Sequence, residues 1–373
     1  MVVGEAGAGN SRIMEVLAKA LSTLYEEKVV DRDGFYKIVD RLILNPKSIT
    51  AGELYGSFNL LTNEWSDGIV PKLVRSCVDD NNNGSPNRKW IIFDGPVDAV
   101  WIENMNTVLD DNKTLCLANS ERIKLPATLH MMFEVQDLKV ASPATVSRCG
   151  MVYMEQVHVG VLSLVKTWGQ TVLKEISSVK ASKNILGVIE AHLEAAIDFI
   201  QYNCKEKVST SGIQLTGELL NLVAAKLNAE EDTKAVTRDE DKMNALLVWC
   251  FTWSIGANIV DASRPVFCEF LRERFTPLIG SNPKYACLLE EPYDYCVDLK
   301  TGDAKLWLSI TDQFHYNHNE PFFSILVPTV DTTRYRYVLE ILMVNGNNVL
   351  FMGETGVGKS VITSSFLNDM VSQ

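Results

Sequence analysis

The residues with the clearest capacity for chemistry lie near the end of the sequence, where Gly353, Gly356, Gly358, Lys359 and Ser360 have the spacing GxxxxGKS. Glycines at these positions let backbone N–H groups turn toward phosphate oxygens, and the lysine reaches the β- and γ-phosphates of a nucleotide. The serine hydroxyl in the last position is a ligand for Mg²⁺. The sequence therefore predicts a phosphate-binding loop for ATP or ADP with Mg²⁺.

A degenerate copy of the same motif stands near the start of the sequence, with Gly4, Gly7, Gly9, Asn10 and Ser11 in the corresponding places. Asn10 occupies the lysine position, so the glycines and the hydroxyl are kept while the positive charge is missing. On these residues alone, a chance glycine-rich turn explains the pattern as well as a second nucleotide site does. If the loop is a site, Ser11 is its Mg²⁺ ligand.

An acidic residue supplies the second half of such a site. Asp94 ends the apolar segment 89–94, and an aspartate in this place holds Mg²⁺ in phosphate-loop proteins. ATPases of the AAA+ type normally carry a glutamate next, as the base that activates water. Residue 95 is a glycine, which has no side chain for that role, so we expect no hydrolysis at the first loop.

One arginine is a candidate for action on another site. Arg148 comes just before the short apolar segment 151–154, and an arginine in this place can reach the γ-phosphate held by a neighbouring domain, as an arginine finger. An ordinary surface arginine is the alternative, and the spacing alone does not separate the two.

Hydrophobic periodicity indicates the elements that must position these residues. Each loop is expected between a strand and a helix, with Met14, Leu17, Leu21 and Leu24 on one face of the first helix. Strands are predicted at 2–3, 89–94, 129–135, 151–154 and 348–352, a short helix at 101–109 and a polar loop at 79–86. Further on, we expect helices at 185–200, 215–223, 243–260, 335–344 and 361–367, a linker at 229–234 and a β-hairpin at 293–308.

Composition limits the class of protein. With 46% hydrophobic residues, the 373-residue chain can form packed globular domains. The formal net charge of -12 argues against nucleic acid as a partner. Eight cysteines without a CxxC pair indicate reduced thiols rather than a zinc site. The segment 243–260 is interrupted by polar residues and favours a buried helix over a membrane span, and the first residues do not form a signal peptide.

Several longer segments resemble the motor ring of dynein heavy chains, and the resemblance runs from end to end. They are 44–47, 54–56, 91–98, 101–113, 133–138, 141–151 and 327–335. The wording of 95–98 and 356–360 is most similar to axonemal heavy chains. The resemblance implies a ring of AAA+ modules with nucleotide held between neighbours.

The resemblance also implies the fold and its division. We expect an α/β AAA+ phosphate-loop fold, with a three-layer αβα large subdomain at 1–157 as the second ring module and a helical lid at 158–285. Residues 286–373 would be the first part of the next module, so we expect the chain to begin and end inside modules.

The implied function is that of a segment of an ATP-driven, minus-end-directed microtubule motor. The first loop would bind nucleotide structurally, Glu134 would replace the sensor asparagine of a hydrolytic module, and Arg148 would act on the preceding module's ATP. Implied partners are neighbouring AAA+ modules, intermediate and light chains and microtubules, in the axoneme of a cilium or flagellum. The full-length parent would be an ATPase, whereas the isolated segment would not hydrolyse ATP. The alternative is a non-catalytic AAA+ scaffold.

Overall fold

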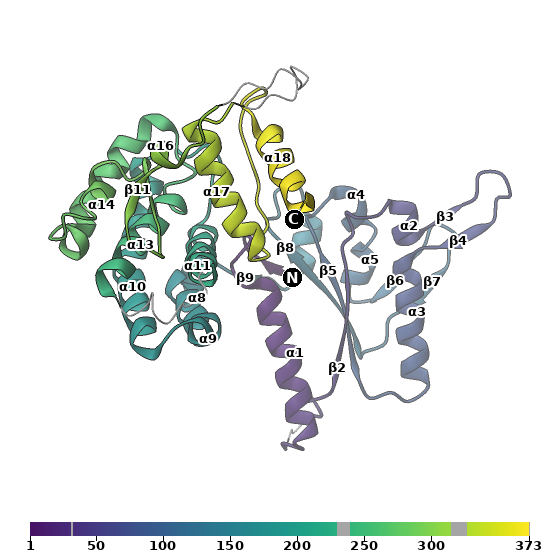
Figure 1. Cartoon of the computed structure of the whole chain (residues 1–373). Coiled ribbons are helices and arrows are strands. Elements are labelled where there is room, and N and C mark those ends of the chain that lie inside the picture. Colours follow the sequence, from purple (N-terminus) through teal and green to yellow (C-terminus); the bar gives the residue numbers. More distant parts are fainter. Residues whose placement is uncertain (31–32, 230–238, 315–326, 373) are drawn as a thin grey trace. The chain divides into compact units, whose positions relative to one another are not determined.

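The computed structural model describes residues 1–30, 33–229, 239–314 and 327–372. The chain forms two compact units, Met1–Val159 and Gly160–Gln373 (Figure 1). Most of the predicted linker at 229–234 lies outside the described residues. All eight cysteines are free thiols, as their spacing predicts.

The first unit is built on a five-stranded parallel sheet with the strand order β2-β5-β8-β1-β9. Its strands are β1 (Val2–Val3), β2 (Val39–Leu44), β5 (Arg88–Asp94), β8 (Leu129–Val135) and β9 (Val152–Tyr153). The predicted strands at 2–3, 89–94 and 129–135 are confirmed. Asp94 pairs in register with Glu134, and Glu134 pairs with Val2. Because parallel strands end at the same edge, the ends of β5 and β8 lie beside the loop that follows β1.

Helices cover both faces of this sheet, so the unit has three layers (Figure 1). Trp90 and Ile92 pack against helix α1 (Asn10–Glu26) on one face. Ile91 and Phe93 pack on the other face, in the cluster that includes helix α3 (Ile69–Asn82). This alternation is the period of two that a strand imposes on its side chains, and it explains why the whole run 90–93 is apolar.

Shorter elements complete the first unit. The helices are α2 (Ala51–Tyr55), α4 (Ala99–Glu103), α5 (Asn106–Leu109), α6 (Pro143–Arg148) and α7 (Gln156–Val159). Two antiparallel hairpins pair β3 (Gly56–Phe58) with β4 (Trp65–Asp67), and β6 (Thr114–Cys116) with β7 (Arg122–Lys124).

The second unit is mainly helical. Its first helices are α8 (Val161–Trp168), a π-helical turn η1 (Gly169–Leu173), α9 (Lys174–Ile176), α10 (Val179–Asn203) and α11 (Gly212–Asn228). They are followed by α13 (Glu240–Trp253), η2 (Asp261–Ser263), α14 (Arg264–Ile279) and α15 (Cys287–Glu290). The chain continues through β10 (Tyr295–Val297), β11 (Ala304–Leu306), α16 (Trp307–Ile310), α17 (Val330–Val344) and α18 (Lys359–Ser372).

Helix α13 is the centre of this unit, because every side chain from Met243 to Trp253 is buried. An apolar surface on all sides is expected of a helix enclosed by other helices. The helix ends at Trp253 rather than at residue 260, so the prediction of one helix over 243–260 is wrong at its end. Among the described residues, no helix is both long and apolar enough to cross a bilayer.

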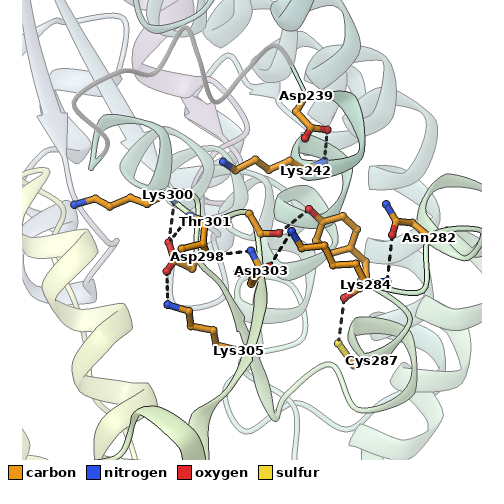
Figure 2. A network of polar contacts seen from close by, with 12 residues as sticks. Asp239, Lys242, Asn282, Lys284, Cys287, Asp298, Lys300, Thr301, Asp303 and Lys305 are labelled. Atoms are coloured by element: carbon orange, nitrogen blue, oxygen red, sulfur yellow. Dashed lines mark hydrogen bonds and ion pairs between the residues drawn. The ribbon is translucent and has the colours of Figure 1, made fainter.

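The predicted hairpin is present as β10 and β11, and polar contacts hold its turn (Figure 2). The Asp298 carboxylate accepts hydrogen bonds from the backbone amides of Lys300 and Thr301 and from Lys305 Nζ. Partial burial raises the pKa of Asp298, but these hydrogen bonds outweigh it and hold the pKa at about 2. Trp307, at the end of the hairpin, packs in the same core as α13.

Four local predictions are wrong. The segment 348–352 forms no strand, and Leu350 is 81% exposed. A strand needs hydrogen-bonding neighbours, and among the described residues of this unit β10 and β11 pair only with each other. In α1, Ala18 is buried beside Met14 and Leu21 while Leu17 is exposed. Helix α3 extends into the predicted loop at 79–86, and the predicted helix at 101–109 is divided into α4 and α5.

Candidate functional site

The two glycine-rich loops have the same backbone conformation. In the first loop Gly7 and Gly9 have φ of 86° and 90°, and in the second Gly356 and Gly358 have φ of 87° and 84°. These values lie in the left-handed region that favours glycine. The first loop connects β1 to α1, and the second leads directly into α18. The structure thus gives the degenerate sequence at residues 4–11 the loop geometry of the intact motif.

The residue at the lysine position makes the corresponding contact in both loops. Lys359 Nζ donates to the carbonyl oxygens of Gly353, at 2.7 Å, and Glu354, at 2.5 Å. Asn10 Nδ2 donates to the carbonyl oxygen of Gly4 at 2.8 Å. Asn10 therefore closes its loop as a lysine can, but it brings no positive charge to the place where a phosphate would sit.

Two carboxylates lie at the edge of the sheet beside the first loop. The Ser11 hydroxyl donates to Glu134 Oε1, and Asp94 is the neighbour of Glu134 in register. Burial raises the pKa of Glu134, the hydrogen bond from Ser11 lowers it, and the nearby Asp94 raises it again; the net shift is upward. Ser11 and Asp94 have the oxygen donors that Mg²⁺ prefers, although Ser11 is bound to Glu134 here. A phosphate without Mg²⁺ would face negative charge at this edge.

The residue after Asp94 has no room for a side chain. A Cβ atom placed on Gly95 would lie 2.8 Å from Asn45 Oδ1 and 3.3 Å from Pro46 Cδ. Asn45 Oδ1 accepts a hydrogen bond from the backbone amide of Lys47 at 2.9 Å, so the turn fixes its position. Geometry thus adds to the sequence argument, because a catalytic glutamate could not replace Gly95 without moving this turn. Sequence reasoning missed Asn45, for which the pattern gives no signal.

Arg148 ends helix α6 and is bound within its own unit. Its Nε atom donates to Asp110 Oδ1, and its NH1 group donates to the carbonyl oxygen of Ala144 at 2.9 Å. The Arg148 side chain remains 35% exposed. Sequence reasoning singled out Arg148 but not Asp110; an acidic residue directly after a short helix was the only signal available.

The described residues thus form two separate candidate sites and one exposed cation. The loop at 353–360 has the lysine and hydroxyl that a Mg²⁺–nucleotide complex requires, so its side chains fit that group. The loop at 4–11 fits it only in part, because the cation is missing. Among the described residues, no group of three or more His, Cys, Asp or Glu side chains forms a metal site without a nucleotide.

Three family models match the chain in succession. "AAA domain (dynein-related subfamily)" matches residues 1–149, "Dynein heavy chain AAA lid domain" matches 185–309, and "P-loop containing dynein motor region" matches 314–373. With the parallel sheet and the helical unit, these matches define the class: an α/β AAA+ fold with a helical lid.

Similarity to individual proteins gives the family. The chain is 42% identical to human "Dynein axonemal heavy chain 6" over 99% of its own length and 9% of the relative's. It is 38% identical to mouse "Dynein axonemal heavy chain 1", over 98% and 9% respectively, and 38% identical to human "Dynein axonemal heavy chain 2", over 100% and 8%. The chain belongs to the dynein heavy chain family, in its axonemal group, and spans about a tenth of the length of these relatives.

Proposed function

We propose that this chain is a segment of the ATP-driven, minus-end-directed microtubule motor ring of an axonemal dynein heavy chain. The similarity to axonemal heavy chains over nearly the whole chain supports the assignment. In this proposal residues 1–157 are the large subdomain of the second AAA+ module, 158–285 its lid, and 286–373 the start of the next module. The protein acts in the axoneme of a cilium or flagellum, with neighbouring modules, intermediate and light chains and microtubules as partners.

Residues 353–360 are the proposed ATP- or ADP-binding loop, and the contact of Lys359 with the Gly353 carbonyl is the observation that carries this part. When nucleotide binds, the Lys359 ammonium exchanges its loop carbonyls for phosphate oxygens. Gly353, Gly356 and Gly358 let backbone N–H groups face the phosphates, and Ser360 provides a ligand for Mg²⁺. The Mg²⁺ ion would neutralise part of the phosphate charge.

The first loop has a different proposed role. Asn10 fastens the loop to Gly4 without a charge, Gly95 has no side chain, and Glu134 places a carboxylate beside Ser11. These features support structural or weak Mg²⁺–nucleotide binding, with Gly4, Gly7 and Gly9 around the phosphates, and no hydrolysis. They also favour the second candidate function, a non-catalytic AAA+ scaffold, for this unit alone.

Arg148 is the proposed arginine finger for the ATP of the preceding module. It ends a helix, remains partly exposed and keeps its charge, which are the properties that such a finger needs. An arginine finger contributes about 10³–10⁵ in rate in other phosphoryl-transfer proteins. The segment's contribution to catalysis then lies in a site formed with another module.

A titration with a fluorescent ATP analogue and Mg²⁺ tests the nucleotide proposal on the 373-residue chain. Lys359→Ala should weaken binding by about 10- to 150-fold, because hydrogen bonds to charged groups contribute about 1.5–3 kcal/mol. Lys166→Ala, at an exposed lysine of α8, is the matched control and should bind as the wild type does. Equal and negligible binding by all three proteins would remove the nucleotide claim for this chain.

A further inference from the structure

Two polar contacts join helix α6 to helix α5. Thr145, which is fully buried, donates through its hydroxyl to Asn106 Oδ1 at 3.1 Å. Arg148 Nε donates to the carboxylate of Asp110. Asn106 begins α5 and Asp110 is its C-cap residue, so the two contacts lie at the two ends of α5.

The start of α6 is also fixed. The Ser142 hydroxyl accepts a hydrogen bond from the Thr145 amide at 3.2 Å, and Pro143 stands at the first position of the helix. Both features favour a helix that begins at one defined residue. The backbone that carries Arg148 is therefore held in place, and the direction of the long side chain is the freedom that remains.

The contacts of Arg148 restrict that freedom. The Asp110 carboxylate binds Nε, and the carbonyl of Ala144, one helical turn back, binds NH1. A guanidinium has five N–H donors in a rigid plane. These two bonds use two of them on one side of the plane, which leaves other donors to reach a phosphate.

We propose that Asp110 is the positioning residue for Arg148, and that it holds the guanidinium in the orientation in which it meets the γ-phosphate of the neighbouring module. This inference rests on the proposed role of Arg148 as an arginine finger. Orientation matters to the reaction because a misplacement of about 1 Å at a catalytic group can cost about 100-fold in rate. Asp110 touches neither substrate nor reacting atoms and acts only through Arg148.

Stability alone gives little reason for this ion pair. The side chains of Arg148 and Asp110 are 35% and 40% exposed, and pairs with such access to water add little to folding. Replacing Asp110 should therefore leave the domain folded, and this makes the effect on turnover open to measurement.

Asp110→Asn in the full-length heavy chain that contains this segment is the test. Asparagine has nearly the shape of aspartate and keeps one oxygen acceptor, but it loses the charge. Asp111→Asn changes the neighbouring exposed carboxylate, for which the structure records no side-chain contact, and is the matched control. Asp110→Glu, Arg148→Ala and the double variant complete the set. Microtubule-stimulated ATP turnover is measured against ATP concentration, with thermal unfolding to verify the fold.

We expect Asp110→Asn to lower kcat by about 5- to 50-fold with little change in KM, as a loss of orientation predicts. Asp110→Glu should recover most of that loss, and Asp111→Asn should match the wild type. In the Arg148→Ala background, Asp110→Asn should have no further effect, since the residue that it positions is absent.

The outcomes separate this inference from the proposed function. If Arg148→Ala leaves turnover unchanged, the arginine finger is wrong and the role of Asp110 is wrong with it. If Arg148→Ala abolishes turnover while Asp110→Asn leaves it unchanged or raises it, only the positioning role is overturned. An equal effect of Asp110→Asn with and without Arg148, or no recovery in a folded Asp110→Glu protein, overturns it too.

Discussion

Replacing Asn10 by lysine tests whether the first loop lacks only a positive charge. Asn10 Nδ2 donates one hydrogen bond to the Gly4 carbonyl, and Lys359 makes the same bond to Gly353 in the second loop. A lysine at position 10 can therefore keep the loop closed. The change should cost no more than the net value of one hydrogen bond, about 0.5–1.5 kcal/mol of folding free energy.

The gain in binding should be larger than that cost. A lysine in this place makes a charge-assisted hydrogen bond to a phosphate, which contributes about 1.5–3 kcal/mol, or roughly a 10- to 150-fold lower Kd. The backbone already has the left-handed glycines of the intact loop, so no rearrangement needs to precede binding. We expect Asn10→Lys to bind Mg²⁺–ATP in this range more tightly than the parent protein.

The assay is a titration with a fluorescent ATP analogue, carried out in the Lys359→Ala background so that the second loop does not contribute. Asn10→Gln is the matched control, because it lengthens the side chain and keeps an amide without adding charge. If Asn10→Lys and Asn10→Gln bind equally while both are folded, the missing charge is not what limits the first loop, and the reasoning fails.

Two further predictions concern the same edge of the sheet. Gly95→Glu should destabilise the first unit by about 1–3 kcal/mol, because its Cβ would crowd Asn45, and should produce no ATP turnover; thermal unfolding and phosphate release measure both, and turnover above the wild type would contradict the argument. Glu134→Gln should stabilise this unit at pH 7. The folded pKa of Glu134 is raised, so the wild-type glutamate contributes its stability below its ordinary pKa of 4.5 and loses it as the pH rises through the folded value; urea unfolding should show the gain of the variant shrinking toward pH 4.5, and an equal gain at both pH values would refute the cause.

Much of the fold follows from the sequence where one physical signal dominates. Apolar runs that end in an acidic residue predicted β5 and β8 well, because both strands are buried on both faces. Apolar stripes predicted α10 and α11 for the same kind of reason. The glycine spacing predicted both loops, since left-handed residues leave few other choices.

Predictions failed where the outcome depends on partners that a local pattern does not contain. Residues 348–352 have the composition of a strand but no strand beside them in the described part of this unit. Leu17 has the right spacing, yet the short side chain of Ala18 is the one that lies against the sheet. At the candidate site, spacing identified Arg148 but could not reveal Asp110, which is 38 residues away and reached through packing.

The strand order has a consequence for the sequence of events during synthesis. Within the first unit β1 is synthesised before its partners β8 and β9, which lie much later in the sequence. At about 5–20 residues per second, β1 waits about 7–26 s before its first partner is complete.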